Sequence, residues 1–145
     1  MTAAEYGFAA IGADARQQAV DRIVEMGYNA VLGDLLSLSV SKPVAVLSLA
    51  DVLEHVPYPR QALQRAHSAI QDDGLLVVSC PNLDCGSWRQ STTKGINPYW
   101  GEIEHHHNFS RSSLMRLLAQ ERFMPLEYSI SARYKSCMEV VARRA

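Results

Sequence analysis

The chain has 145 residues and a mass of 16.1 kDa, which is the size of one ordinary domain and leaves little room for a second. Hydrophobic residues make up 48% and charged residues 20%, so the composition excludes a disordered or fibrous chain. Lys and Arg total 14 against 15 Asp and Glu, and no basic excess is left to neutralise nucleic-acid phosphates. We therefore expect a single domain over residues 1–145 whose main partner is not nucleic acid.

The sequence favours a cytoplasmic protein. No apolar run approaches the roughly 20 residues that a membrane span requires. The N-terminus lacks the basic segment and apolar stretch of a signal peptide. Cys80, Cys85 and Cys137 are an odd number, which disfavours a disulfide framework, and we expect three reduced thiols.

Hydrophobic periodicity divides the first half of the chain into alternating strands and helices. The predicted elements are a buried strand over residues 6–13, a helix over 16–26, strands over 28–32 and 43–50, a helix over 57–71 and a strand over 75–80. Asp14 and Gln17 have the spacing of a capping box at the first helix, and Gly27 is expected to end that helix.

The second half of the chain begins with residues 81–109, which show no clear period and are too long for an ordinary connection. Such a segment is typical of a lid or a binding loop. Ser110 is expected to cap the next helix. Two β-rich segments, 123–130 and 134–142, then predict an antiparallel hairpin. The whole pattern predicts an α/β fold with a mostly parallel sheet and an antiparallel hairpin at its edge.

Acidic side chains follow the ends of the predicted strands. Asp14 follows the first strand, Asp34 the second and Asp51 the third. Ligands of open α/β sheets bind beyond the carboxyl ends of the strands, and carboxylates there suit a ligand rich in hydroxyl or amino donors. A helix N-cap at Asp14 and a plain turn at Asp34 remain alternative interpretations.

Several motifs along the chain resemble one family. They are Ile-Gly-Ala-Asp (11–14), Gly-Asp-Leu (33–35), Ala-Asp-Val-Leu-Glu-His-Val (50–56), Asp-Gly-Leu-Leu-Val-Val-Ser-Cys-Pro-Asn (73–82) and His-Asn-Phe-Ser (107–110). In this order they resemble the class I S-adenosylmethionine-dependent methyltransferases of small molecules, especially the O-methyltransferases of the ubiquinone pathway. The resemblance covers nearly the whole chain. It implies a Rossmann-like sheet and methyl transfer from S-adenosylmethionine to a small-molecule substrate.

The resemblance also implies a set of cofactor-binding residues. Asp14 matches the acid that binds the ribose hydroxyls of S-adenosylmethionine. Asp34 matches the acid near the adenine amino group, with Leu35 beside the ring. Ala50 and Asp51 match the strand-end segment that passes the methionine part and the methyl group.

Two histidines are candidate catalytic groups. The resemblance places His107 near the substrate, where an imidazole can accept the proton of a hydroxyl, and His55 is the second candidate. In some ubiquinone-type relatives an acid, a Glu and a His at the positions of Asp51, Glu54 and His55 hold a divalent metal. We expect no metal here. The run of histidines 105–107 suits a single ion poorly, because consecutive side chains point in different directions.

Aromatic side chains concentrate in the long segment before Ser110. Trp88, Tyr99 and Trp100 all fall in it, and both tryptophans of the chain are among them. They are predicted to contact a flat or apolar substrate as part of a lid. Packing of the segment against the sheet is an equally good interpretation.

The sequence departs from the family at its start. The family's first strand is followed by a glycine-rich turn, G-x-G-x-G, which is absent here. That strand lies at the centre of the family's sheet, between the first and third strands predicted above. Its absence predicts a gap, which an upstream segment of a longer protein or a second copy of the chain would fill, unless the sheet is rearranged. We favour a fragment of a longer protein. The alternative functions are a non-catalytic methyltransferase-like module and, more weakly, a nicotinamide dehydrogenase.

Overall fold

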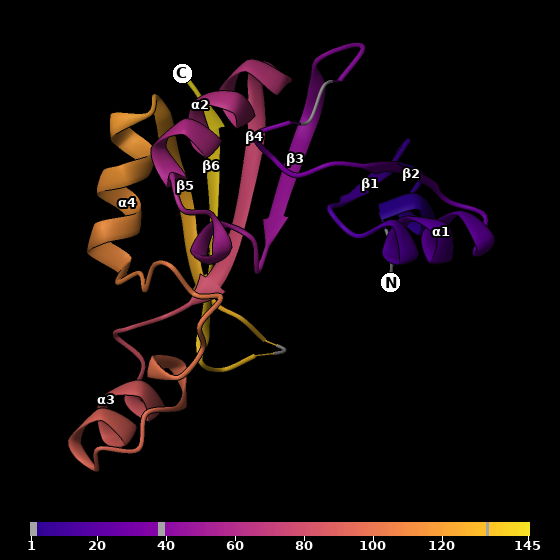
Figure 1. Ribbon diagram of the computed structural model, residues 1–145. Coiled ribbons are helices and arrows are strands. Elements are labelled where there is room, and N and C mark those ends of the chain that lie inside the picture. Colours follow the sequence, from indigo (N-terminus) through magenta and orange to yellow (C-terminus); the bar gives the residue numbers. More distant parts are fainter. Residues whose placement is uncertain (1–2, 38–39, 133) are drawn as a thin grey trace. The chain divides into compact units, whose positions relative to one another are not determined.

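The computed structural model describes residues 3–37, 40–132 and 134–145. The chain divides into two compact units, Met1–Ser39 and Val40–Ala145, called the first and second unit below (Figure 1). The expectation of one domain over 1–145 stays a prediction. Among the described helices, none combines the length and the apolar character that a membrane span needs.

The first unit is a small parallel strand pair with one helix. Its elements are a 3-10 turn η1 (Ala3–Tyr6), strand β1 (Ile11–Asp14), helix α1 (Gln17–Glu25) and strand β2 (Asn29–Leu32). β1 and β2 pair in parallel, as the alternating pattern predicts. The predicted buried strand over 6–13 is wrong in its first half, where the chain turns and Tyr6 and Phe8 are exposed. A strand forms from Ile11, but it is not buried, since Ile11 is also exposed.

The start of α1 also differs from the prediction. Arg16 occupies the N-cap position and makes no side-chain cap, so the capping box of Asp14 and Gln17 does not form. Asp14 instead accepts hydrogen bonds from the backbone N–H and the guanidinium Nε of Arg16, at 2.9 and 3.0 Å. The Gln17 amide donates to Asp21. The end of the helix is as predicted, because Gly27 adopts the left-handed backbone conformation at φ +85°.

The second unit contains a four-stranded sheet in the order β3-β4-β6-β5. The strands are β3 (Val44–Ala50), β4 (Ile70–Pro81), β5 (Phe123–Ile130) and β6 (Cys137–Arg144). β3 and β4 are parallel, whereas β6 is antiparallel to both β4 and β5. The predicted hairpin at the end of the chain is therefore confirmed. β4 begins earlier than predicted, because the Asp73–Gly74 turn is only an irregularity in its pairing with β3.

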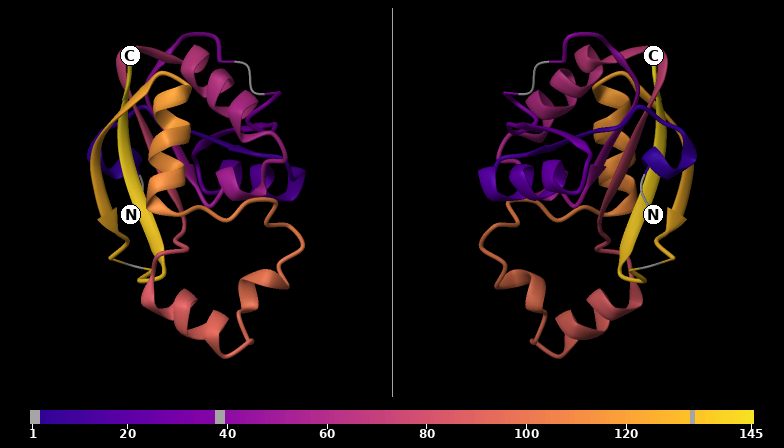
Figure 2. Two further views of the ribbon diagram at one scale, coloured as in Figure 1. Left: turned by 90° about the vertical axis from the view of Figure 1, so that its left-hand side faces the viewer. Right: turned by 90° about the vertical axis from the view of Figure 1, so that its right-hand side faces the viewer.

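Two helices, α2 (Pro59–Ala69) and α4 (Arg111–Gln120), cover one face of this sheet (Figures 1 and 2). From Gly74 to Cys80 every second residue of β4 is buried, as period-2 alternation requires. The ion pair of Arg60 with Glu121 joins the start of α2 to the end of α4, with Nε and Oε1 2.7 Å apart. The hydrogen bonds from Arg60 and Gln64 hold the pKa of Glu121 below its usual value.

The two sheets are separate in the described part of the chain. β1 pairs with β2 alone and β3 with β4 alone, so each has one open edge. These are the two strands between which the family places its first strand. Among the described strands, none pairs with the open edge of β1 or of β3, so the strand that the resemblance places there is absent from the described sheets.

The segment predicted to be irregular, 81–109, contains regular structure. Helix α3 (Gly86–Thr93) and the 3-10 turn η3 (Pro98–Trp100) lie in it, beyond the carboxyl end of β4 (Figure 2). The helix is hard to detect in the sequence because Trp88 is its only buried residue. Its N-cap is Cys85, whose sulfur accepts a hydrogen bond from the Trp88 N–H, and cysteine is not a usual capping residue.

Replacing Ser110 by alanine is expected to lower the free energy of unfolding by about 1 kcal/mol. The Ser110 hydroxyl accepts from the Ser113 N–H at 3.1 Å, and the Ser113 hydroxyl accepts from the Ser110 N–H at 2.9 Å, which completes a capping box. Urea unfolding measures the loss, with Gln120→Ala, at an exposed position in the last turn of the same helix, as the control. Equal losses in the two variants would contradict the capping role.

Candidate active site at the carboxyl ends of β3 and β4

A cavity of about 290 Å³ opens beyond the ends of β3 and β4 in the second unit. Its lining comes from the turn after β3, the end of β4, the end of the 81–109 segment and the C-terminal hairpin. The lining residues are Asp51, Glu54, His55, Pro81, Tyr99, His105, Tyr134, Ser136 and Cys137. Open α/β sheets bind their ligands at this position.

Asp51 marks the point where the chain leaves β3. Its backbone has φ 51°, a left-handed conformation that is costly for a residue other than glycine. The Asp51 N–H donates to the Ser79 carbonyl at 2.9 Å, which holds this conformation against β4. The strained backbone turns the chain into the 3-10 turn η2 (Leu53–His55), which forms one wall of the cavity.

Glu54 is buried in that wall. Glu54 is only 1% exposed, and neither of its carboxylate oxygens has a hydrogen-bond partner among the described residues. Burial raises the pKa of this carboxyl to about 7, and the neighbouring charge of Asp51 acts in the same direction. A buried carboxyl without a partner is rare in folded proteins and indicates a group that awaits a ligand or a proton.

Three hydrogen bonds join the segment 54–57 to the segment 104–107, and we call this connection the clasp. The His107 N–H donates to the Glu54 carbonyl at 3.1 Å, and His107 Nε2 lies 3.2 Å from the Pro57 carbonyl. His55 Nδ1 lies 3.0 Å from the Glu104 carbonyl. Because a carbonyl oxygen only accepts, this contact assigns a proton to Nδ1 of His55 and leaves Nε2 outside the hydrogen bond.

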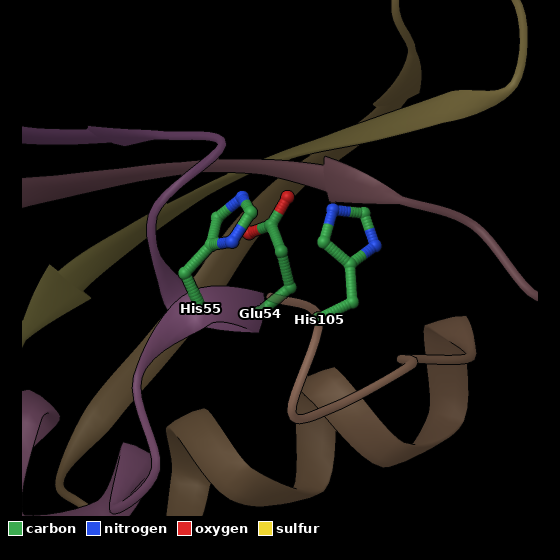
Figure 3. Close-up of side chains that lie close together, drawn as sticks. All are labelled: Glu54, His55 and His105. Atoms are coloured by element: carbon green, nitrogen blue, oxygen red, sulfur yellow. The ribbon is translucent and has the colours of Figure 1, made fainter. Parts of the chain in front are cut away.

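The clasp brings His105 beside Glu54 and His55 (Figure 3). The rings of His55 and His105 meet edge to face with centroids 4.6 Å apart. Tyr99 lies 6.2 Å from His105, ring to ring, and stacks on Trp88 at 4.6 Å. These ring contacts form an aromatic row from Trp88 of α3 to His105 in the cavity wall. The Tyr99 hydroxyl donates to the Ser136 hydroxyl at 3.2 Å.

The structure brings together only part of the predicted site of the second unit. Asp51, His55 and Tyr99 line the cavity, and Ala50 precedes Asp51 at the end of β3. His107 lies outside the lining, in the clasp. Trp88 is buried behind Tyr99, whereas Trp100 is 61% exposed. The roles assigned to these residues stay predictions.

The remaining predicted residues belong to the first unit. Asp14 ends β1, and its hydrogen bonds with Arg16 lower its pKa. Asp34 follows β2 and accepts from the N–H and hydroxyl of Ser37, both at 2.7 Å, which also lowers its pKa. Both carboxylates are therefore ionised at neutral pH, as acceptors of ribose or amino hydrogens need to be. Leu35 is buried.

Sequence reasoning missed several residues of the cavity. Glu54 entered only as a ligand in relatives, and His105 only as a member of the histidine run. Ser136 and Cys137 were missed because the last hairpin reaches the cavity through tertiary structure alone. One signal was available in the sequence: a Glu-His pair occurs at 54–55 and again at 104–105.

A family model described as a methyltransferase domain matches residues 2–123. The chain therefore belongs to this methyltransferase family. A comparison with curated protein sequences finds no significant match.

Solved structures with the same fold agree with this assignment. A methyltransferase from Thermotoga maritima that depends on S-adenosylmethionine has a TM-score of 0.73 at 13% identity, over 93% of this chain and 72% of its own. Magnesium protoporphyrin IX methyltransferase from Synechocystis, with bound S-adenosylhomocysteine, has a TM-score of 0.72 at 15% identity, over 93% and 64%.

A third neighbour was solved with bound 1,6-didemethyltoxoflavin and S-adenosylhomocysteine. It is the 1,6-didemethyltoxoflavin-N1-methyltransferase of Burkholderia thailandensis, with a TM-score of 0.72 at 16% identity, over 98% of this chain and 64% of its own. The chain thus spans about two thirds of the length of these proteins. S-adenosylmethionine is the cofactor of the class to which the fold belongs.

Removing the Tyr99 ring is expected to expose Trp88, which is 5% exposed and stacks on Tyr99. In a Trp100→Phe background only Trp88 emits, and its fluorescence should be blue-shifted and weakly quenched by acrylamide. Tyr99→Ala should shift the emission to the red and increase quenching, whereas Tyr99→Phe keeps the stacked ring and should leave both unchanged. Solvent-exposed emission before Tyr99 is changed would contradict the stacking.

Proposed function

We propose that the protein transfers a methyl group from S-adenosylmethionine to a small molecule that enters the cavity beyond β3 and β4. One observation carries this proposal: in a chain of the methyltransferase family, the strained residue Asp51 and the buried carboxyl of Glu54 lie at the strand ends where open α/β sheets bind ligands. A purely structural turn at this place needs neither feature.

The residues present fit the cofactor in part. Asp14 and Asp34 present ionised carboxylates at the ends of β1 and β2, which suit the ribose hydroxyls and the adenine amino group. Leu35, which the resemblance places beside the ring, is buried and presents little surface to a ligand. Ala50 and Asp51 lie at the end of β3, where the resemblance places the methionine part. The glycine-rich turn of the family is absent, so these contacts would have to hold the cofactor without it.

Reaction requires an acceptor heteroatom in line with the methyl group, and alignment supplies most of the rate. S-adenosylmethionine, when bound, supplies the methyl group on a sulfonium sulfur. The acceptor gains the methyl as the carbon–sulfur bond breaks, and it loses a proton. His55 is the better placed of the two predicted bases, since its free Nε2 belongs to a residue lining the cavity. His107 uses its N–H and Nε2 in the clasp and acts as a positioning residue.

A non-catalytic methyltransferase-like module is the second candidate. The open edges of β1 and β3 and the missing glycine-rich turn favour it, because the chain then lacks the segment that lets the backbone approach the cofactor in this family. An upstream segment or a second copy that completes the sheet stays a prediction for either function.

Calorimetry with S-adenosylhomocysteine separates the two functions. The enzyme is expected to bind one equivalent, either as this chain or as a version extended upstream to include the missing strand. Binding by the extended version alone would show that this chain is an incomplete cofactor site. Absence of binding in both would exclude the enzyme and leave the module.

In the version that binds, Asp14→Ala is expected to weaken cofactor affinity by roughly 1–3 kcal/mol, because it removes the acceptor of a charged hydrogen bond. Asp21→Ala, which removes the same charge from α1, is the control and should bind as the unmodified protein does. Equal affinity in the Asp14 and Asp21 variants would refute the assignment of Asp14 to the ribose.

A further inference from the structure

We propose that Glu54, His55 and His105 form a binding site for a divalent transition-metal ion in the wall of the cavity. One ligand atom of each residue lies within 4.8 Å of those of the other two (Figure 3). A small rotation of the side chains brings such atoms onto a single ion at ligand distances of about 2.0–2.2 Å. The site differs from the one that the family resemblance implied, because His105 rather than Asp51 completes it.

Buried polar atoms without a hydrogen-bond partner support a cation site at this place. Both carboxylate oxygens of Glu54 and Nδ1 of His105 are buried without a hydrogen-bond partner among the described residues. Buried polar groups are nearly always paired, because an unpaired one loses its hydrogen bonds to water without replacement. A cation would neutralise the Glu54 carboxylate and be coordinated by one ring nitrogen of each of the two imidazoles.

The orientation of His55 fits a metal ligand. The Glu104 carbonyl accepts from its Nδ1 at 3.0 Å, which leaves the lone pair of Nε2 free. Histidines that bind metals almost always donate their other N–H to a carbonyl or carboxylate in this way. The clasp therefore fixes both the tautomer of His55 and the position of His105, and the site is largely formed before any ion arrives.

The ligand set indicates the kind of ion. Two imidazoles and one carboxylate suit zinc, iron(II), cobalt(II) or nickel(II), whereas calcium and magnesium prefer oxygen ligands alone. Three protein ligands leave at least one coordination position, and the three residues all line the cavity. This is the arrangement of a catalytic rather than a structural metal site.

The role of the ion rests on the proposed function, but the existence of the site does not. An ion open to the cavity would bind the oxygen of a hydroxyl acceptor and lower its pKa, so that the acceptor loses its proton to water and reacts as an anion. In this form the Nε2 of His55 holds the ion and does not act as the base. The substrate class that follows is a phenol, enol or other acidic hydroxyl compound.

The test is a titration of the whole chain, purified without a metal-affinity column and treated with a chelator, with cobalt(II) followed by visible absorption. We expect one equivalent to bind, with the visible bands of a four- or five-coordinate ion. His105→Ala and the nearly isosteric Glu54→Gln should each weaken binding by more than about 100-fold, since even indirect contacts to a metal ligand are worth 10- to 100-fold. His106→Ala, which changes an exposed neighbour in the same histidine run, should bind as the unmodified chain does.

Two results would overturn the site. One is the absence of stoichiometric binding in the unmodified chain, which would leave His55 as a base. The other is equal binding in folded Glu54→Gln, His105→Ala and His106→Ala variants, with folding checked by circular dichroism. The fate of the proposed function is separate, because calorimetry with S-adenosylhomocysteine tests it. Cobalt binding without cofactor binding keeps the metal site and removes methyl transfer.

Discussion

The clasp between residues 54–57 and 104–107 is the connection on which the candidate site depends. Its backbone bond, from the His107 N–H to the Glu54 carbonyl, ties the turn after β3 to the end of the 81–109 segment. Its two side-chain bonds fix the rings of His55 and His107 against carbonyl oxygens. Together they hold His105 beside the buried carboxyl of Glu54. Burial in this wall of the cavity is the main cause of the raised pKa of Glu54.

The fold follows largely from local sequence signals, and the site does not. Apolar periodicity predicted α2, α4 and the final hairpin, because α2, α4 and β6 bury regularly spaced side chains. It also predicted β2 and β3, whose apolar runs form strands although few of their side chains are buried. It failed at residues 6–13, whose apolar side chains are exposed, and at α3, which buries a single tryptophan. The histidine run shows the limit for the site. Consecutive side chains point in different directions, and local sequence does not tell which one faces the cavity. The long-range clasp places His105 in the cavity wall and joins His107 to the carbonyls of Glu54 and Pro57.

The two units carry different parts of the chemistry that the family implies. The first unit holds ionised carboxylates at its strand ends, each fixed by a local turn. The second holds the strained Asp51, the buried Glu54 and the histidines around a cavity. The strand that the family places between β1 and β3 is missing from the described sheets, together with the glycine-rich turn. The cavity does not need that strand for its walls, since all of its lining belongs to the second unit.

The central claim is that the clasped cavity beyond β3 and β4 receives the reacting end of the cofactor. A crystal structure with S-adenosylhomocysteine, of this chain or of its extended version, tests the claim most directly. The account predicts that the sulfur of the ligand faces the cavity between Asp51 and the Glu54–His55–His105 cluster, with the clasp intact. A ligand bound elsewhere, or a clasp that is open while the ligand is bound, would contradict it.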